Sequence, residues 1–103
     1  MTSEKADFVH LHVHTAYSLL DSILRLSDLF RKAKEYKMPA IAMTDHGNLF
    51  GAIEFYRQAE RTGIKPIIGC ELYIAPRSRF DKSSSGNGES SRHLVVNVQY
   101  KIL

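Results

Sequence analysis

The chain has 103 residues, enough to bury one modest hydrophobic core. Hydrophobic residues make up 44% of the sequence and charged residues 24%, a balance typical of a globular domain rather than a disordered chain. The formal net charge of +3 comes from Lys and Arg spread along the chain, so no basic block predicts a nucleic-acid groove. The sequence shows neither an apolar run near the ~20 residues of a membrane span nor a secretory signal, and its single cysteine cannot form an internal disulfide. These features favour a cytoplasmic protein without membrane contact.

The first predicted element is a strand over about residues 8–13, where apolar and polar residues alternate. His10, His12 and His14 then share one side of the strand, and neutral imidazole is a common ligand of zinc-like metals. If this strand belongs to a parallel sheet covered by helices, as the rest of the chain predicts, His12 and His14 have no solvent face to occupy. This favours metal ligation over ordinary polar positions. His10 lies farther from the strand end, so we expect it to be a structural histidine or to form a hydrogen bond that supports a metal ligand, rather than to be a ligand itself.

A loop over residues 15–25 follows and carries Asp21, for which metal ligation and a turn or capping role are equally compatible with the spacing. A helix comes next, with Ser27 as N-cap and Asp28 in its first turn, and it ends near Met38–Pro39. Its apolar stripe is formed by Leu26, Leu29, Phe30, Ala33 and Tyr36.

The short apolar run Ala40–Thr44 predicts a strand buried on both faces. Residues 45–48 form the loop at its C-terminal end. Asp45 is suited to orient an imidazole or to help bind a metal, and His46 is a candidate ligand, although Asp-His-Gly also fits simple turn chemistry. We favour the functional interpretation.

A second amphipathic helix is predicted to begin near Leu49 or Phe50, and Gly63 is placed to end it in a left-handed C-cap. One side of this helix carries Leu49, Ala52, Ile53, Tyr56 and Ala59. Residues 66–74 form a third strand. Glu71 lies within this apolar strand, and a buried carboxylate must be paired, protonated or bound to a cation, which favours a ligand. Cys70 alternates to the opposite face, where we expect a small core residue.

Residues 93–98 predict a fourth strand, and His93 at its start fits a ligand and a plain polar position equally well. Residues 76–92 have few apolar side chains, which predicts a mobile surface loop. Strands and helices in alternation predict an α/β fold with parallel strands and crossover helices.

In such a fold the carboxyl ends of strands bring His14, His46 and Glu71 to one rim. The sequence contains no Gly-x-Ser-x-Gly, phosphate-loop or Cys-x-x-Cys motif. Histidines and carboxylates at one rim suit two or three divalent ions and an activated water, which indicates phosphoester hydrolysis.

With these motifs, the sequence resembles the polymerase and histidinol phosphatase (PHP) domain, and most closely the N-terminal PHP segment of bacterial replicative DNA polymerase III alpha subunits. The similarity covers about residues 7–98 and rests on residues 8–15 with 17–21, 44–52, 65–71 and 93–95. The resemblance implies that six residues are metal ligands, for Zn²⁺ or Mn²⁺: His12, His14, Asp21, His46, Glu71 and His93.

The resemblance also implies a distorted (β/α)7 barrel. Residues 1–103 are then a partial PHP domain that lacks the C-terminal half of the barrel and its Asp-x-His ligands. The parent protein is expected to be a DNA-directed DNA polymerase whose Mg²⁺ site lies outside this chain. We expect the chain alone to be inactive, and to be marginally stable or to self-associate through unpaired sheet edges.

Two roles for the domain follow from the resemblance. It is either a metal-dependent 3′–5′ exonuclease that proofreads, or a non-catalytic domain that stabilises the polymerase and docks a separate proofreading exonuclease subunit. Ligand-type residues at all six matched positions favour the first role. The expected partners are DNA, the exonuclease subunit and other replisome subunits. A free-standing PHP phosphatase is a third alternative, disfavoured by the polymerase-like residues 44–75.

Overall fold

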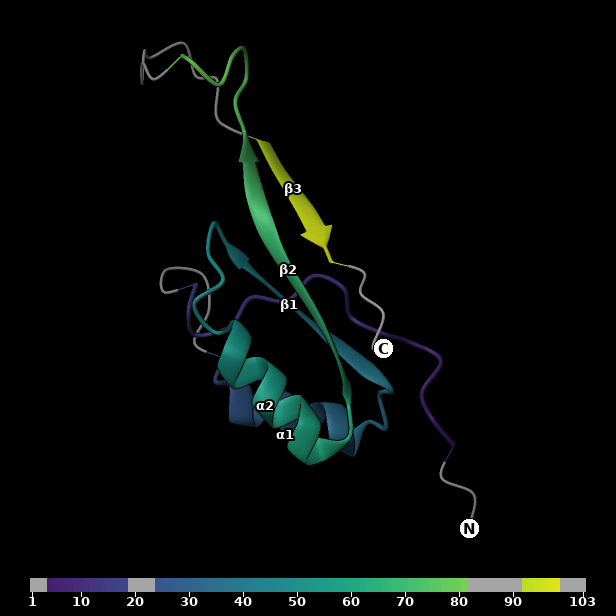
Figure 1. The fold of residues 1–103 in the computed structure, drawn as a ribbon. Helices are drawn as coiled ribbons and strands as arrows, with labels where there is room; N and C mark the ends of the chain where they lie inside the picture. The colour runs from purple at the N-terminus through teal and green to yellow at the C-terminus, as the bar shows by residue number, and fades with distance from the viewer. Residues whose placement is uncertain (1–3, 19–23, 82–91, 99–103) are drawn as a thin grey trace.

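The computed structural model describes residues 4–18, 24–81 and 92–98. Figure 1 shows a small sheet with the helices packed beside its lower half. The elements, in chain order, are α1 (Leu26–Glu35), β1 (Ala40–His46), α2 (Ala52–Thr62), β2 (Lys65–Ile74) and β3 (Arg92–Asn97). The predicted ligand Asp21 and residues 82–91 of the predicted surface loop lie outside the described residues.

The sheet has the strand order β1-β2-β3. β1 and β2 are parallel and are connected through α2, as predicted, and their register places His46 beside Glu71. β3 is antiparallel to β2, so the prediction of parallel strands throughout is wrong for β3. A parallel neighbour requires a long crossover, usually a helix, and the sequence between β2 and β3 lacks the apolar residues that would hold such a helix on the sheet.

The core lies between the two helices and β1. Phe30 of α1 and Phe55 of α2 are almost fully buried, with ring centroids 5.1 Å apart, and they pack over Ile41 and Met43 of β1. β1 is buried along nearly its whole length, as its apolar sequence predicts. The helices therefore hold β1 in a fixed position, and with it the polar residues at its C-terminal end.

Both helices differ in detail from the predictions. α1 begins at Leu26 with Arg25 before it, so Ser27 lies in the first turn and is not the N-cap. Tyr36 follows the helix and is exposed instead of completing the apolar stripe.

In α2 the buried residues are Phe55 and Ala59, whereas Ile53 is 69% exposed. The aromatic ring of Phe55 is larger than the Ile53 side chain and packs against Phe30. The buried face of the helix therefore differs from the predicted one. Gly63 ends the helix with a φ of 74°, which confirms the predicted left-handed C-cap.

Residues 8–13 are extended but do not form the predicted strand. They run beside β1 (Figure 1), and Ala42 N–H donates to the His10 carbonyl while Thr44 N–H donates to the Val13 carbonyl. Between these two bonds β1 advances by two residues and the segment by three. The extra residue breaks the regular ladder in the manner of a β-bulge.

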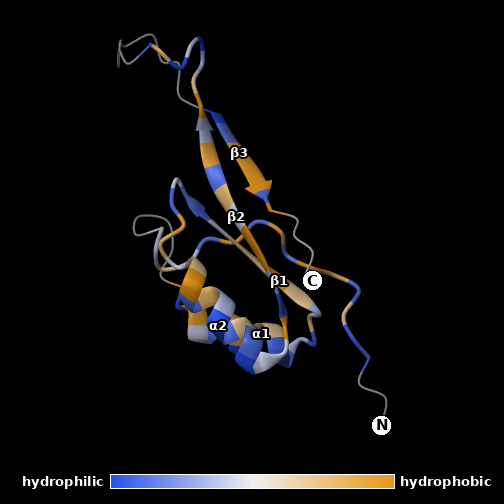
Figure 2. Cartoon of the chain, in the orientation of Figure 1, coloured by the Kyte–Doolittle hydropathy of each residue, from blue (hydrophilic) through white to orange (hydrophobic). Residues whose placement is uncertain are grey.

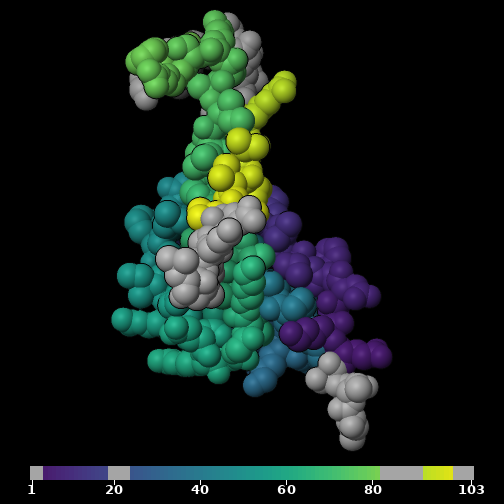
Figure 3. Space-filling view, turned by 45° about the vertical axis from the view of Figure 1, so that its right-hand side comes forward, coloured from purple at the N-terminus to yellow at the C-terminus, as the bar shows by residue number. Residues whose placement is uncertain are grey.

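β2 and β3 extend beyond the helices as a narrow two-stranded ribbon (Figure 3). Figure 2 colours much of this ribbon as hydrophobic. Its apolar residues Leu72, Ile74, Leu94 and Val96 are exposed. Neither helix of the described part of the chain has the length and apolar character needed to cross a membrane.

Candidate metal centre

Glu71 is the centre of a cluster of histidines. Its carboxylate is buried, at 5% relative exposure, although β2 is more exposed on both sides of it. The imidazole nitrogens around it are His14 Nε2 at 2.5 Å and His46 Nε2 at 3.2 Å from Oε2, with His93 Nδ1 at 3.3 Å and His12 Nε2 at 3.4 Å from Oε1. Four of the five histidines in the chain thus surround one carboxylate.

Backbone geometry explains how two of these histidines reach Glu71. Val13 N–H donates to Thr44 Oγ1 at 2.9 Å, and the Val13 carbonyl accepts the Thr44 N–H at 2.8 Å. The Val13 side chain packs against the core. Because neighbouring residues of an extended chain point to opposite sides, burial of Val13 turns both His12 and His14 toward Glu71.

The other two histidines arrive from the sheet itself. His46 ends β1 and lies beside Glu71 in the parallel register. His93 of β3 pairs with Tyr73, which is two residues beyond Glu71 and therefore on the same face of β2. The cluster thus contains residues from all three strands, with the carboxylate on the central strand β2. The extended segment before α1 supplies the other two histidines.

The surroundings of Glu71 also set its charge. Burial raises the pKa of the Glu71 carboxyl and is the largest single influence. The hydrogen bond from His14, the charges of His46 and His14 and the hydrogen bond from His12 together outweigh burial, so the pKa lies below its ordinary value. The carboxylate is therefore ionised near neutral pH, the form in which it binds metal ions.

The ligand atoms form two groups that share Glu71, one with His12 and His14 and the other with His46 and His93. Within each group these atoms lie within 4.8 Å of one another. Atoms that each lie about 2 Å from a common ion are at most about 4 Å apart, so the spacing within each group is near what one ion requires. Imidazole nitrogen with carboxylate oxygen is a donor set that suits Zn²⁺ and Mn²⁺, so the residues fit divalent metal. Five of the six predicted ligand positions come together, and Asp21 is outside the described residues.

Asp45 is fully buried and supports the cluster indirectly. Its carboxylate accepts hydrogen bonds from Thr15 N–H at 2.6 Å, Thr15 Oγ1 at 2.7 Å and Ser18 Oγ at 2.7 Å. Ser18 Oγ in turn accepts the His46 N–H at 3.1 Å. Asp45 therefore fixes the residues next to His14, in place of the predicted contact with an imidazole.

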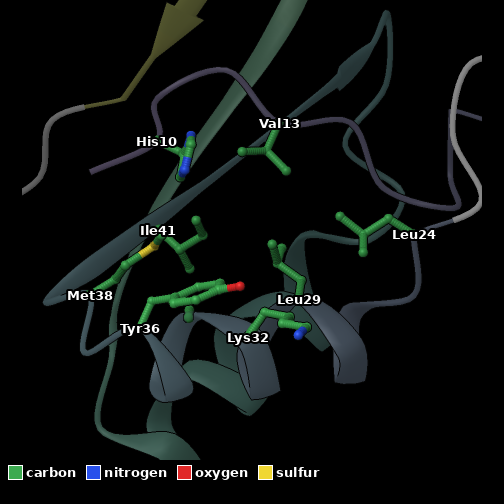
Figure 4. A pocket seen from close by; sticks show the side chains of 9 residues that line it. His10, Val13, Leu24, Leu29, Lys32, Tyr36, Met38 and Ile41 are labelled. Atoms are coloured by element: carbon green, nitrogen blue, oxygen red, sulfur yellow. The ribbon is translucent and has the colours of Figure 1, made fainter. Parts of the chain in front are cut away.

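His10 does not share the face of the other histidines. Figure 4 shows it beside Val13 above a mainly apolar pocket of about 270 Å³ against α1, and its ring contacts Phe8. The extra residue in the segment accounts for this, because it changes the alternation between His10 and His12. Cys70 lies on the face opposite Glu71 and is partly buried, with Sγ 3.5 Å from the Asp45 carbonyl.

Two residues of the centre were not singled out in the sequence. Ser18 bridges Asp45 and His46, and Tyr73 contacts His46 and His93. For Tyr73 the signal was the alternation itself, since a residue two positions after Glu71 lies on the same face. Ser18 carries no comparable signal, because Ser in a loop is common.

The βαβ unit, the antiparallel strand β3 and the cluster of potential metal ligands define an α/β domain with a candidate metal centre. A family model described as the PHP domain matches residues 10–102, so the chain belongs to the PHP domain family.

Several relatives of the chain share one name. The DNA polymerase III subunit alpha of Borreliella burgdorferi is 53% identical over 94 residues, which are 91% of this chain and 8% of that protein. The protein of the same name from Saccharopolyspora erythraea is 59% identical over 85 residues, 82% of this chain and 7% of that protein. The chain therefore spans only 7 to 8% of the length of these curated relatives.

A solved structure shows the same fold. A protein from Bifidobacterium adolescentis, assigned as a metal-dependent phosphoesterase, matches with a TM-score of 0.68 and 20% identity over 91% of this chain and 29% of the other. The expected α/β fold of the PHP family is thereby confirmed.

Proposed function

We propose that the chain is the metal-binding N-terminal part of the PHP domain of a bacterial replicative DNA polymerase III alpha subunit, and that its centre serves phosphoester hydrolysis. One observation carries the proposal: four imidazoles surround the buried Glu71 carboxylate. A buried carboxylate is costly unless it is paired or bound to a cation. The relatives named DNA polymerase III subunit alpha support the choice of parent protein.

In this proposal His12, His14, His46, Glu71 and His93 hold divalent metal, with Zn²⁺ or Mn²⁺ as the expected ions, and Asp21 joins them. Bound metal lowers the pKa of a coordinated water and neutralises charge on a phosphoryl group. The protein's own part is to hold the imidazoles in place. Glu71 gathers all four imidazoles around its two oxygens, and Asp45 fixes the segment after His14.

Metal binding is the first test. Elemental analysis and calorimetry with Zn²⁺ and Mn²⁺ compare the chain with a His12→Ala, His14→Ala double variant. His10→Ala is the matched control, because His10 lies in the same segment but faces the pocket. We expect stoichiometric binding that the double variant loses and the control keeps. No binding by the unsubstituted chain, or equal binding by the double variant, would contradict the proposal.

The substrate class that we propose is the 3′ end of DNA, so that the centre proofreads as a 3′–5′ exonuclease within the longer polymerase. We also propose that the longer protein binds DNA and other replisome subunits and is located in the cytoplasm. The test is a full-length polymerase with Glu71→Gln, assayed for release of 3′ nucleotides and, as a control for folding, for Mg²⁺-dependent DNA synthesis. We expect the variant to lose 3′ nucleotide release and to retain DNA synthesis. Unchanged 3′ release would exclude this centre as its source.

The second candidate function is docking of a separate proofreading exonuclease subunit. The exposed apolar side chains of the β2–β3 ribbon favour it, because contiguous apolar surface marks interaction sites. Binding of the exonuclease subunit to the full-length polymerase distinguishes the two. Docking predicts loss of binding when Leu72 and Leu94 are changed to Gln, with no effect of Glu71→Gln.

A further inference from the structure

Tyr73 lies against the histidines of the centre without being a metal ligand. It follows Glu71 by two residues on β2 and pairs with His93 of β3. Its ring is nearly parallel to that of His46, at 20° with centroids 5.9 Å apart, and perpendicular to that of His93, at 90° with centroids 4.9 Å apart. Two of the four histidines therefore have Tyr73 as a direct neighbour.

The Tyr73 hydroxyl faces a particular atom of His46. The oxygen lies 3.4 Å from His46 Nδ1, whereas Nε2 of the same ring faces Glu71 at 3.2 Å. When Nε2 gives its lone pair to a metal ion, the proton of a neutral imidazole is on Nδ1. The Tyr73 hydroxyl oxygen is then an acceptor within reach of this N–H, at a side chain that is only 15% exposed to water.

We propose that Tyr73 is a positioning residue for the metal centre: its hydroxyl oxygen accepts the Nδ1–H of His46 and so keeps Nε2 free for metal. This inference rests on the proposed metal-binding function. A hydroxyl suits the task, since it donates to a bare Nδ1 before metal binds and accepts from Nδ1–H afterwards. Partners of this kind hold ligand imidazoles in the correct tautomer and orientation, and their loss typically weakens metal binding ten- to a hundredfold.

Tyr73→Phe isolates the hydroxyl, because it keeps the ring contacts with His46 and His93. Tyr73 is 58% exposed, so the substitution leaves the core intact. Tyr36→Phe is the matched control, since Tyr36 is equally exposed at 57% but follows α1. Zn²⁺ affinity is measured by competition with a chromophoric chelator. We expect Tyr73→Phe to bind Zn²⁺ about tenfold more weakly or worse, and Tyr36→Phe to bind it like the unsubstituted chain.

A spectroscopic readout separates positioning from a general loss of structure. In the Zn²⁺-loaded chain, nitrogen NMR should show a protonated His46 Nδ1 whose hydrogen exchanges slowly, and in folded Tyr73→Phe this hydrogen should exchange rapidly. Adding Tyr73→Phe to His46→Ala should cause no further loss of affinity. Equal affinity and equal exchange in Tyr73→Phe would overturn the inference alone. Absence of Zn²⁺ binding by the unsubstituted chain would overturn the metal centre, and the inference with it.

Discussion

At the scale of single residues, Asp45 links two parts of the candidate centre through its hydrogen bonds to Thr15 and Ser18. We predict that Asp45→Asn lowers the free energy of unfolding by about 2 kcal/mol, because an amide group replaces one acceptor oxygen and leaves buried donors unpaired. Urea denaturation measures the change. Metal affinity should fall as well, since the residues after His14 lose their anchor.

Asp28→Asn is the control for Asp45→Asn, because it removes a carboxylate that is exposed and paired with Arg31 at 3.2 Å. An exposed ion pair of this kind contributes less than about 1 kcal/mol. Equal destabilisation by the two variants would show that the buried hydrogen bonds of Asp45 contribute no more to the free energy of unfolding than an exposed ion pair.

A second residue pair gives a pH-dependent prediction. Tyr17 donates its hydroxyl to Glu54 of α2 at 2.8 Å, and this hydrogen bond, together with the Glu54 charge, raises the pKa of Tyr17 above 10.0. A raised pKa means that the folded state holds the proton more tightly. The bond therefore stabilises the fold where Tyr17 is protonated and Glu54 is ionised, and this stability is lost as the pH rises through the raised pKa of Tyr17.

The expected result is that Glu54→Gln lowers the pKa of Tyr17 toward its ordinary value. NMR titration of the Tyr17 ring resonances measures it. Glu60→Gln, which removes an exposed carboxylate farther along α2, should leave the Tyr17 titration unchanged. If Tyr17 has the same pKa in both variants as in the unsubstituted chain, Glu54 does not determine the pKa of the Tyr17 hydroxyl.

Much of the candidate centre follows from residue type and position. Glu71 in an apolar strand and His46 at a strand end are unusual enough to indicate a site, and the parallel register brings them together. Asp45 was predicted to act at the site, but its partners were not, because they depend on how the segment around Thr15 folds back. Tyr73 was missed because exposed aromatic residues are ordinary on protein surfaces.

At the scale of elements, Gly69 controls the junction between β2 and β3. A Cβ there would lie against the Val96 carbonyl oxygen, 2.5 Å from Asn97 Oδ1 and 3.0 Å from Thr44 Cγ2. The Asn97 side chain at this point reaches Leu11, donating Nδ2–H to its carbonyl at 3.2 Å. Gly69 therefore allows β3 and the histidine-bearing segment to meet across β2.

We predict that Gly69→Ala destabilises the fold by about 1–3 kcal/mol, because the clash involves backbone that cannot rotate away. Hydrogen exchange should show lost protection along β3. Gly63→Ala is the contrasting variant: its Cβ meets nothing within 4 Å, and its cost comes from a positive φ at the end of α2. Loss of β3 protection in Gly63→Ala, or its retention in Gly69→Ala, would contradict this assignment.

The elements that the sequence predicted best are those with a simple pattern. β1 reads as a run of apolar residues and β2 as a longer one, and both form. Residues 8–13 show the alternation of a strand, but alternation does not reveal an inserted residue, so neither the bulge nor the separate direction of His10 was predictable. The direction of β3 likewise depends on pairing between distant residues and has no local signature.

At the scale of the whole molecule, the class of fold was predictable from the order of elements, while the amount of uncovered apolar surface was not. On the face of the β2–β3 ribbon opposite Glu71, Leu72 pairs with Leu94 across the strands, and Val96 lies nearby opposite Cys70. All three apolar side chains are more than 40% exposed. Among the described residues β3 also has a single neighbouring strand, so its outer edge is available for pairing.

This surface predicts that the chain self-associates at micromolar concentration, because joining two such ribbons removes apolar area from water and pairs free strand edges. Sedimentation velocity over a concentration series measures it. Leu72→Gln with Leu94→Gln should shift the chain toward monomer while preserving Zn²⁺ affinity, since both side chains lie on the face opposite Glu71. Leu49→Gln, an exposed leucine outside the ribbon, should leave the association unchanged. A folded monomer at every concentration would mean that the exposed strands tolerate water, and the ribbon would then lose its support as an interaction surface.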